Sequence, residues 1–490
     1  MTMEEFDVVI VGAGLSGISA AYHLQQESPD RSYTILEARD AIGGTWDLFR
    51  YPGVRSDSDM FTLGYSFRPW TSDRAIAEGP LIRDYIRETA QVHGITPRIR
   101  FGHRVTAASW RSDEARWTVN VAAGDGQRSF RCRFLFFCSG YYDYAQGHEP
   151  AWPGRESFGG RIVHPQHWPQ DLDYAGKKVV VIGSGATAVT LLPEMAKTAA
   201  HVTMLQRSPS YIIALPARDA IGSMLQRLLP RRAAYELIRW KNILITIGLF
   251  QYMRRWPQSA RRFLVKQAQQ QTRLSEAQSR KHLTPRYDPW DQRLCIAPDA
   301  DIFKVLRSGQ AAIVTDAIER FTPQGLLLAS GEELQADVIV TATGLQLKMS
   351  GGAQLTVDGQ PVDPSRCLTY KGMMYSGVPN LAAALGYTNA SWTLKAELIA
   401  RYTCRLLNHM RDRRLDICVP WHDDTGEPTE PAINLTSGYV QRAAAVLPRQ
   451  GMRPPWRVYQ NYVRDLLSLK LSSLHDGAMR FAARGETPRP

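Results

Sequence analysis

Short apolar runs that lead into glycine-rich turns occur twice along the chain. The run at residues 7–11 leads into Gly-Ala-Gly-Leu-Ser-Gly at 12–17, and the run at 178–182 leads into Gly-Ser-Gly-Ala-Thr-Ala at 183–188. The residues after each turn fit a helix. This order of strand, turn and helix is typical of dinucleotide-binding units, in which pyrophosphate meets the backbone N–H groups of the turn. The pattern predicts an α/β protein with two Rossmann-like units.

The residue that follows the second strand of each unit distinguishes the two nucleotides. In the first unit the strand at 33–36 ends at Glu37, which can accept hydrogen bonds from ribose hydroxyls and repels a 2′-phosphate. That acid indicates FAD. In the second unit the strand at 201–205 is followed by Gln206, Arg207 and Ser208. An arginine at this place can pair with a 2′-phosphate, which favours NADPH over NADH; a surface arginine with no ligand is the alternative.

The remaining periodicity places other elements around these two units. A helix is expected at 80–94, and strand-like runs at 98–110, 116–121 and 129–137 predict a small antiparallel sheet. Residues 217–291 have a helical pattern and interrupt the second unit. We therefore expect an FAD-binding domain from residues 1–141 and 347–490, an NADPH-binding domain from 142–216 and 292–346, and a helical insertion at 217–291.

Length and composition fit a globular protein with more than one core. A chain of 490 residues, 44% of them hydrophobic, is long enough for two or three domains. Its six cysteines include no close pair such as C-x-x-C, which argues for reduced thiols and against a metal site or a disulfide reductase. The acidic residues at the N-terminus fit no secretory signal, so we expect a cytoplasmic protein.

Positive charge is concentrated in the predicted insertion. Residues 221–282 contain 13 Lys and Arg against two acids, or +11 of the total +12. Within them, residues 242–253 carry no charge, too few to span a bilayer. Peripheral contact with an anionic membrane is one interpretation. A buried helix with solvated basic neighbours is the other, and we favour it because charge clusters are usually solvated faces. Nothing beyond bulk charge points to nucleic acid.

Two longer motifs give the chain a family resemblance. Residues 158–169 spell F-x-G-x-x-x-H-x-x-x-W-P, and residues 43–57 spell G-G-x-W-x4-Y-P-G-x3-D. Both patterns resemble signatures of the Baeyer–Villiger monooxygenases, class B flavoproteins that use NADPH and O2 to convert ketones into esters. The resemblance covers nearly the whole chain and is closest to the ethionamide-activating branch. His164 and His167 lack further ligands nearby, so we predict a linker histidine at 164 with a conformational role and no metal site.

The resemblance also implies which residues contact the cofactors. For Trp46 and Thr45 it implies a place against the flavin ring, and for Val105 a backbone contact with adenine. Asn389 is expected as the N-cap of a helix whose N-terminus faces the reduced flavin, with an ordinary capped helix as the alternative. The complete predicted set is Gly12, Ala13, Gly14, Ser16, Gly17, Glu37, Ala38, Gly44, Thr45, Trp46, Asp57, Val105 and Asn389 for FAD, and Gly183, Ser184, Gly185, Ala186, Thr187, Arg207 and Ser208 for NADPH.

For catalysis the resemblance singles out Arg293 and Asp57. Arg293 matches the arginine that stabilises negative charge on the oxygenating species, and Asp57 matches its carboxylate partner. A plain ion pair between domains is the alternative. Relatives carry a lysine just before this arginine, whereas Gln292 stands here, which weakens the expected preference for NADPH. Candidates for the substrate pocket, with core packing as the alternative, are Tyr287, Trp290, Met373, Met374 and Tyr375.

The predicted reaction is therefore insertion of one oxygen atom of O2 next to a ketone carbonyl, giving an ester or lactone through a C4a-peroxyflavin. Oxidation of sulfides and thioamides is the expected side activity. Two rivals stay open: a flavin-containing N- or S-oxygenase, and a protein that binds FAD and NADPH without turnover.

Overall fold

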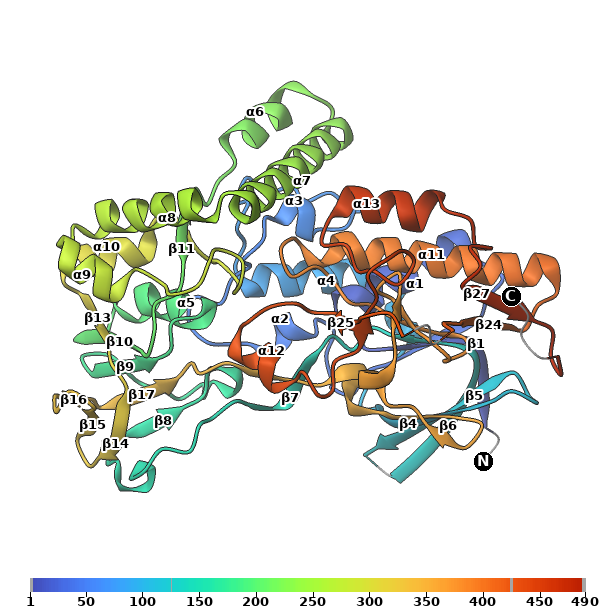
Figure 1. Ribbon diagram of the computed structural model, residues 1–490, viewed down its shortest axis with the longest axis horizontal. Helices are drawn as coiled ribbons and strands as arrows, with labels where there is room; N and C mark the ends of the chain where they lie inside the picture. The colour runs from blue at the N-terminus through green and yellow to red at the C-terminus, as the bar shows by residue number, and fades with distance from the viewer. Residues whose placement is uncertain (1–2, 125, 424–425, 487–490) are drawn as a thin grey trace.

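The larger of two main sheets carries the first glycine-rich turn. The computed structural model describes residues 3–124, 126–423 and 426–486. Nine strands of the described chain form this sheet, with β6 at the junction of its parallel and antiparallel parts (Figure 1). The strands are β1 (Glu4–Val11), β2 (Tyr33–Leu36), β3 (Ile99–Arg100), β4 (Arg104–Arg111), β5 (Arg116–Ala123), β6 (Gly126–Phe137), β19 (Gln354–Val357), β20 (Gln360–Pro361) and β23 (Leu381–Ala383).

The predicted small antiparallel sheet is not separate. β4, β5 and β6 are antiparallel as expected, but β6 is twelve residues long and also pairs in parallel with β1 and β23. One strand therefore belongs to both parts, and the antiparallel strands extend the nucleotide-binding sheet. Helix α1 (Leu15–Glu27) packs on the long α11 (Trp392–Arg413), and α4 (Gly79–Val92) lies beside them, where the helix at 80–94 was expected.

The second sheet carries the second glycine-rich turn. Its five strands are all parallel, in the order β13-β10-β9-β17-β8, and most residues of the three central strands are buried. Helices α5 (Ala186–Met195) and α10 (Asp301–Ser308) cover it. The strands are β8 (Arg161–Val163), β9 (Lys178–Ile182), β10 (His201–Gln206), β13 (Ala311–Thr315) and β17 (Val338–Thr341), and a small antiparallel sheet of β14 (Ile318–Thr322), β15 (Gly325–Leu328) and β16 (Glu333–Gln335) adjoins it.

The chain passes between the two sheets on a pair of short antiparallel strands, β7 (Tyr142–Gly147) and β18 (Leu345–Leu347). A second short pair, β11 (Ile212–Leu215) and β12 (Cys295–Pro298), closes the base of the insertion. The insertion is helical: α6 (Ala220–Leu228), α7 (Arg231–Arg255), α8 (Pro257–Thr272) and α9 (Glu276–His282). Two Rossmann-like units and a helical insertion confirm the predicted fold class.

Helices α6 and α7 project from the rest of the molecule at the top of Figure 1. The uncharged stretch 242–253 lies inside α7, and we expected it to be a buried helix. That expectation is wrong, because only one face of α7 is covered: Ile243 and Met253 are buried, whereas Leu244 and Ile245 are each 57% exposed. No helix among the described residues is long and apolar enough to cross a membrane.

The C-terminal part returns to the first sheet and packs beside α11. Helix α13 (Tyr462–Leu466) continues into a π-helical turn, η6 (Leu467–Leu471), which packs on α11. The other short elements are α2 (Thr45–Leu48), α3 (Met60–Leu63), α12 (Gly438–Arg442), β21 (Thr369–Tyr370), β22 (Met374–Tyr375), β24 (Ile417–Pro420), β25 (Glu430–Pro431), β26 (Arg449–Gln450) and β27 (Met479–Ala482).

Candidate active site

The first glycine-rich turn has the shape that a dinucleotide needs. Gly12 has φ +103°, a conformation that L side chains rarely adopt. A Cβ on Gly17 would lie 1.9 Å from the carbonyl oxygen of Gly12, so α1 can approach β1 only because Gly17 has no side chain. A Cβ on Gly14 would meet the Cα of Gly44 at 3.4 Å. These close approaches leave backbone N–H groups at the start of α1 open to a pyrophosphate, which fits FAD.

Glu37 anchors the turn from the end of β2. Its carboxylate accepts hydrogen bonds from the backbone N–H of Ala13 at 2.6 Å and of Arg39 at 2.9 Å. Burial raises the pKa of Glu37, and these N–H groups oppose the rise. Glu37, Ala38 and Val105 all line the large cavity described next. The acid thus faces the cavity while it fixes the turn, as a ribose-binding residue would.

A cavity of about 670 Å³ lies between the two nucleotide-binding sheets. Residues from β1, α1, the 43–58 segment, the chain after β6, α5 and the chain just after the insertion all contribute to its wall. The predicted residues that line it are Gly12, Gly14, Ser16, Glu37, Ala38, Gly44, Thr45, Trp46, Asp57, Val105, Ala186, Thr187 and Arg293.

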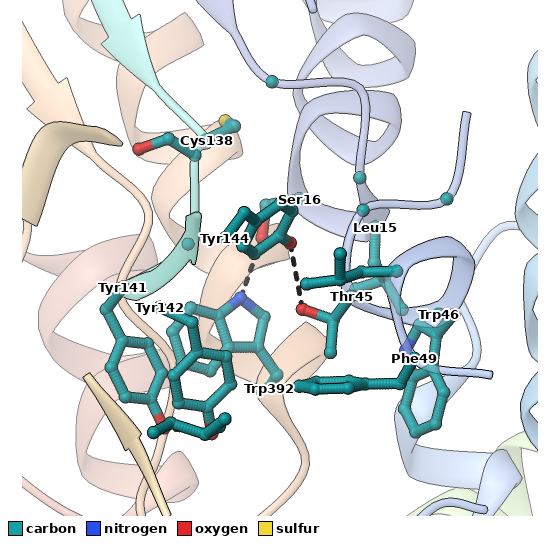
Figure 2. Close-up of a pocket in the computed structure, with 18 of the residues that line it drawn as sticks. Leu15, Ser16, Thr45, Trp46, Phe49, Cys138, Tyr141, Tyr142, Tyr144 and Trp392 are labelled. Carbon is teal, nitrogen blue, oxygen red and sulfur yellow. Dashed lines mark hydrogen bonds between the residues drawn. The ribbon is translucent and has the colours of Figure 1, made fainter. Parts of the chain in front are cut away.

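Aromatic side chains form the central wall of this cavity, as Figure 2 shows. Tyr144 shares a hydrogen bond of 3.1 Å with Thr45 Oγ1. The indole N–H of Trp392 donates to Ser16 Oγ at 2.8 Å, and Tyr141 stacks on Trp392 with 5.1 Å between ring centroids. Sequence reasoning missed these rings. The tyrosines follow β6, and the carboxyl end of a parallel strand is where such sheets bind ligands, so that position was a usable signal.

Asp57 and Arg293 meet at the cavity wall. Arg293 Nη2 lies 3.0 Å from Asp57 Oδ2, and the side chains are 31% and 35% exposed. The Asp57 carboxylate raises the pKa of Arg293 despite burial, so the guanidinium stays charged at all working pH values. Tyr142 is close to the same pair, and burial raises its pKa to about 12. The two residues are brought together from segments more than 230 positions apart, as the resemblance implies.

The second glycine-rich turn presents an open approach. Gly183 has φ +133°, and a Cβ there would meet the carbonyl oxygen of Ala342 at 2.3 Å. A Cβ on Gly185 would meet no described atom within 4 Å, so the backbone at Gly185 is accessible. Ser184 Oγ donates to the carbonyl oxygen of Ser208 at 3.0 Å, which holds the end of β10 beside the turn. Arg207 is exposed and forms no salt bridge with any residue that the structure describes.

Asn389 does not cap α11. The helix begins at Trp392 with Ser391 as its N-cap, and the Asn389 amide donates instead to the carbonyl oxygen of Gln460 at 2.9 Å. The N-cap prediction is wrong because the chain runs two residues further before it turns helical. Ala390 and Trp392, rather than Asn389, line the cavity.

The five aromatic and methionine candidates for the substrate pocket are not among the described residues that line the cavity. Three of the five are core residues, as the alternative held, and the other two are partly buried. Met373, Met374 and Tyr375 are at most 2% exposed in the first-sheet cores, and Tyr287 and Trp290 pack in the insertion's own cluster.

His164 occupies the junction between the two sheets. Its ring lies against Gly147 of β7, where a Cβ would be only 1.9 Å from the ring, and its Nδ1 accepts from the Gln166 backbone N–H at 3.2 Å. Burial lowers the pKa of His164, which favours the neutral ring. Within the described residues no group of three or more His, Cys, Asp or Glu could hold a metal ion.

Comparison with known proteins gives relatives along the whole chain. A family model described as flavin-binding monooxygenase-like matches residues 6–245. The chain is 52% identical over 483 residues to the FAD-containing monooxygenase EthA of Mycobacterium tuberculosis (strain CDC 1551 / Oshkosh), covering 98% of each. It is 47% identical over 488 residues to the probable FAD-binding monooxygenase AlmA of Acinetobacter baylyi, covering 99% of this chain and 97% of that one.

Solved structures with the same fold are more distant in sequence. Oxidized steroid monooxygenase bound to NADP matches with a TM-score of 0.77 and 21% identity, covering 98% of this chain and 100% of that one. Cyclohexanone monooxygenase from Rhodococcus sp. Phi1 bound to NADP+ matches with a TM-score of 0.79 and 19% identity, again covering 98% and 100%.

Two dinucleotide-binding sheets that open onto one cavity, with an ion pair at its wall, define a flavoprotein that brings two nucleotides together. Its relatives over the full length are FAD-containing monooxygenases. The chain belongs to the flavin-binding monooxygenase family and is a flavin-dependent monooxygenase.

Proposed function

We propose that the protein is a Baeyer–Villiger monooxygenase. In the reaction a ketone, O2, NADPH and a proton give an ester or lactone, NADP+ and water. The observation that carries the proposal is the Asp57–Arg293 pair, which places a permanent cation at the wall of a cavity shared by both nucleotide-binding turns. A cation at that place suits a reaction in which negative charge develops on oxygen.

Each part of the site has a role in this proposal. When bound, FAD and NADPH supply the hydride and the activation of O2. Arg293 stabilises negative charge on the attacking oxygen and on the former carbonyl oxygen of the substrate. Asp57 orients the guanidinium and lowers the cost of holding it partly buried. Tyr141 and Trp392, stacked and tied to Ser16, exclude the water that would protonate the oxygenating species.

The choice of NADPH is also a proposal. It is supported by the exposed Arg207 and by Ser208, which is held next to the second turn through Ser184. We assign FAD to the domain of residues 1–141 and 347–490 and NADPH to that of 142–216 and 292–346. His164, packed on the connecting strand β7, is proposed to couple the movements of the two domains.

Oxidation of sulfides and thioamides is the proposed side activity, because an oxygen donor held in this cavity is accessible to a soft sulfur atom as well. The rival N- or S-oxygenase would oxidise sulfides and amines and leave ketones untouched. A protein that binds FAD and NADPH without turnover would bind both cofactors and consume no oxygen.

The test is to supply the FAD-loaded protein with NADPH, air and a panel of linear, cyclic and aryl ketones, and to identify products by mass spectrometry. We expect esters or lactones in amounts equal to the NADPH consumed above the background without ketone. Sulfoxide from a sulfide with no ester from any ketone would assign the protein to the rival N- or S-oxygenases. Anaerobic NADPH that fails to bleach the flavin would exclude both enzymatic assignments.

A further inference from the structure

Large apolar side chains are exposed on one part of the surface, along helices α6, α7 and α13 with its extension η6. We call this surface the upper face, because it forms the top edge of Figure 1. Leu228 is 71% exposed and Leu471 is 69% exposed. The whole set of exposed large apolar residues on these elements is Ile221, Met224, Leu228, Leu237, Trp240, Leu244, Ile245, Leu467 and Leu471.

The spacing of these residues shows that they form stripes. On α6, Ile221, Met224 and Leu228 are separated by three and four residues and therefore share one side of the helix. On α7, residues 237, 240 and 244 repeat this spacing. Scattered exposed apolar residues need no explanation, but contiguous stripes on neighbouring helices mark a surface that another apolar phase covers. Helices α6 and α7 contact one another, so the two stripes lie on neighbouring helices.

The other side of α7 is already occupied. Tyr235 and Ile238 are buried in the core of the first sheet, and the buried Arg239 donates to the Tyr235 hydroxyl and pairs with Glu397 of α11 at 2.8 Å. Arg239 also donates to the carbonyl oxygens of Phe61 and Gly64. Helix α7 is thus fixed to the body of the protein by its buried side, and its apolar outer side is held in place without a cover among the described residues.

The same surface extends onto the C-terminal helix. Trp240 of α7 contacts Tyr462 of α13, with 5.8 Å between their ring centroids. From there the chain continues to Leu467 and Leu471, which lie four residues apart on η6 with Lys470 between them. Elements from the insertion and from the C-terminus therefore contribute to one face.

Basic residues surround the apolar stripes. Residues 220–255, which include α6 and α7, contain seven Lys and Arg against one acid, or +6, and three of the seven, Arg239, Lys241 and Arg254, form ion pairs. Arg227, Arg231 and Arg232 lie at the junction of α6 and α7 and make no salt bridge with a described residue. Exposed leucine and tryptophan among unpaired arginines match the two components of an anionic bilayer surface, which are acyl chains and negatively charged headgroups.

We propose that the upper face binds peripherally to the surface of an anionic lipid membrane, with the apolar stripes of α6, α7 and η6 entering the interface. A second copy of this chain is a poorer occupant. A two-fold interface would bring the same patch, and hence its positive charge, against itself. Negatively charged lipid headgroups instead attract the basic residues beside the stripes. The site is peripheral because no described helix could cross the bilayer.

The experiment is co-sedimentation of the FAD-loaded full chain with vesicles of phosphatidylcholine alone or mixed with phosphatidylglycerol. The test variant is Arg231→Glu/Arg232→Glu. The matched control is Arg111→Glu/Arg320→Glu, which makes the same change in net charge on exposed residues of β4 and β14, at the lower edge of Figure 1. A second variant, Leu228→Ser/Leu244→Ser, removes apolar contacts without changing charge. Retained flavin absorbance reports that each variant is folded.

We expect binding to the mixed vesicles that falls as salt rises and is far weaker on phosphatidylcholine alone. The charge-reversed variant should lose at least about tenfold in membrane partitioning, and the control should lose little. The serine variant should bind less at high salt, where the apolar term dominates. Equal binding by test and control variants, or no binding to the mixed vesicles, would overturn the proposal. A dimer that dissociates on Leu228→Ser/Leu244→Ser, with no vesicle binding, would assign the face to a second copy.

Discussion

Replacing Arg293 by alanine separates the chemistry of oxygen insertion from cofactor binding. The substitution removes the only charge that Asp57 contacts within 4 Å in the described structure, 3.0 Å away. Removing one preorganised group that stabilises a developing oxyanion costs about 10²–10³ in rate. The Arg293 side chain is 31% exposed, so water screens part of its field and we expect the lower end, about a hundredfold loss of ester formation.

Two rates of the Arg293→Ala variant distinguish this loss from damage to the fold. Flavin reduction by NADPH, followed without oxygen in a stopped-flow spectrometer, should stay within about threefold of the unmodified protein. Ester formation, followed by gas chromatography, should fall about a hundredfold, and NADPH should still be consumed with release of hydrogen peroxide. Arg293→Lys tests whether charge alone suffices, since lysine lacks the planar fork that pairs with Asp57. Ester formed by Arg293→Ala at the unmodified rate would remove Arg293 from the mechanism.

Three further predictions concern the cofactors and the fold. Gly17→Ala should give a protein without bound FAD, measured by absorbance after purification, because its Cβ would lie 1.9 Å from the Gly12 carbonyl oxygen. Arg207→Ala should raise KM for NADPH about tenfold or more and leave KM for NADH unchanged, as the loss of a charged contact worth about 1.4–3 kcal/mol requires. Arg239→Ala should lower the free energy of unfolding by about 3 kcal/mol, measured with urea, because the buried Glu397 carboxylate loses its guanidinium partner and keeps only Ser66 and His23.

Matched substitutions control these experiments. Gly185→Ala places a Cβ where no described atom lies within 4 Å, so this variant should keep its FAD, and bound flavin absent from both glycine variants would point to general misfolding. Arg254→Ala removes an ion pair with Asp291 in which the arginine is 48% exposed, and it should change the unfolding free energy by less than about 1 kcal/mol. If Arg239→Ala and Arg254→Ala lowered the free energy of unfolding by similar amounts, burial would not be what makes the Arg239–Glu397 ion pair important for stability.

Local patterns were sufficient to predict the two nucleotide-binding units, because the strand, the glycine-rich turn and the helix follow one another directly in the sequence. The tight contact between Gly17 and the Gly12 carbonyl oxygen likewise lies within one turn. The long-range part of the site was harder to predict. Trp392 reaches Ser16 across 376 positions, and no periodicity in either segment indicates that contact. The start of α11 was also ambiguous in the sequence, because Asn389 and Ser391 are both residue types that suit an N-cap. The hydrogen bond from Asn389 to Gln460 leaves Ser391 as the N-cap.

The insertion shows why a helical pattern cannot report which apolar side is covered. Helix α7 carries apolar residues on two sides, and the sequence favoured a buried helix with solvated charges. The structure covers the side with Tyr235 and Ile238 and leaves Leu237 and Leu244 exposed. The deciding contact is Arg239 with Glu397, a long-range ion pair that turns one side of the helix inward.

The most direct test of the central claim is the fate of molecular oxygen. The FAD-loaded protein, NADPH and a ketone that is turned over would be incubated under ¹⁸O2, and the ester analysed by mass spectrometry. We predict an ester that carries one ¹⁸O atom at the bridging position, with the carbonyl oxygen of the ketone retained. Ester without the label, or reduction of ¹⁸O2 to hydrogen peroxide with the ketone unchanged, would contradict the assignment as a Baeyer–Villiger monooxygenase.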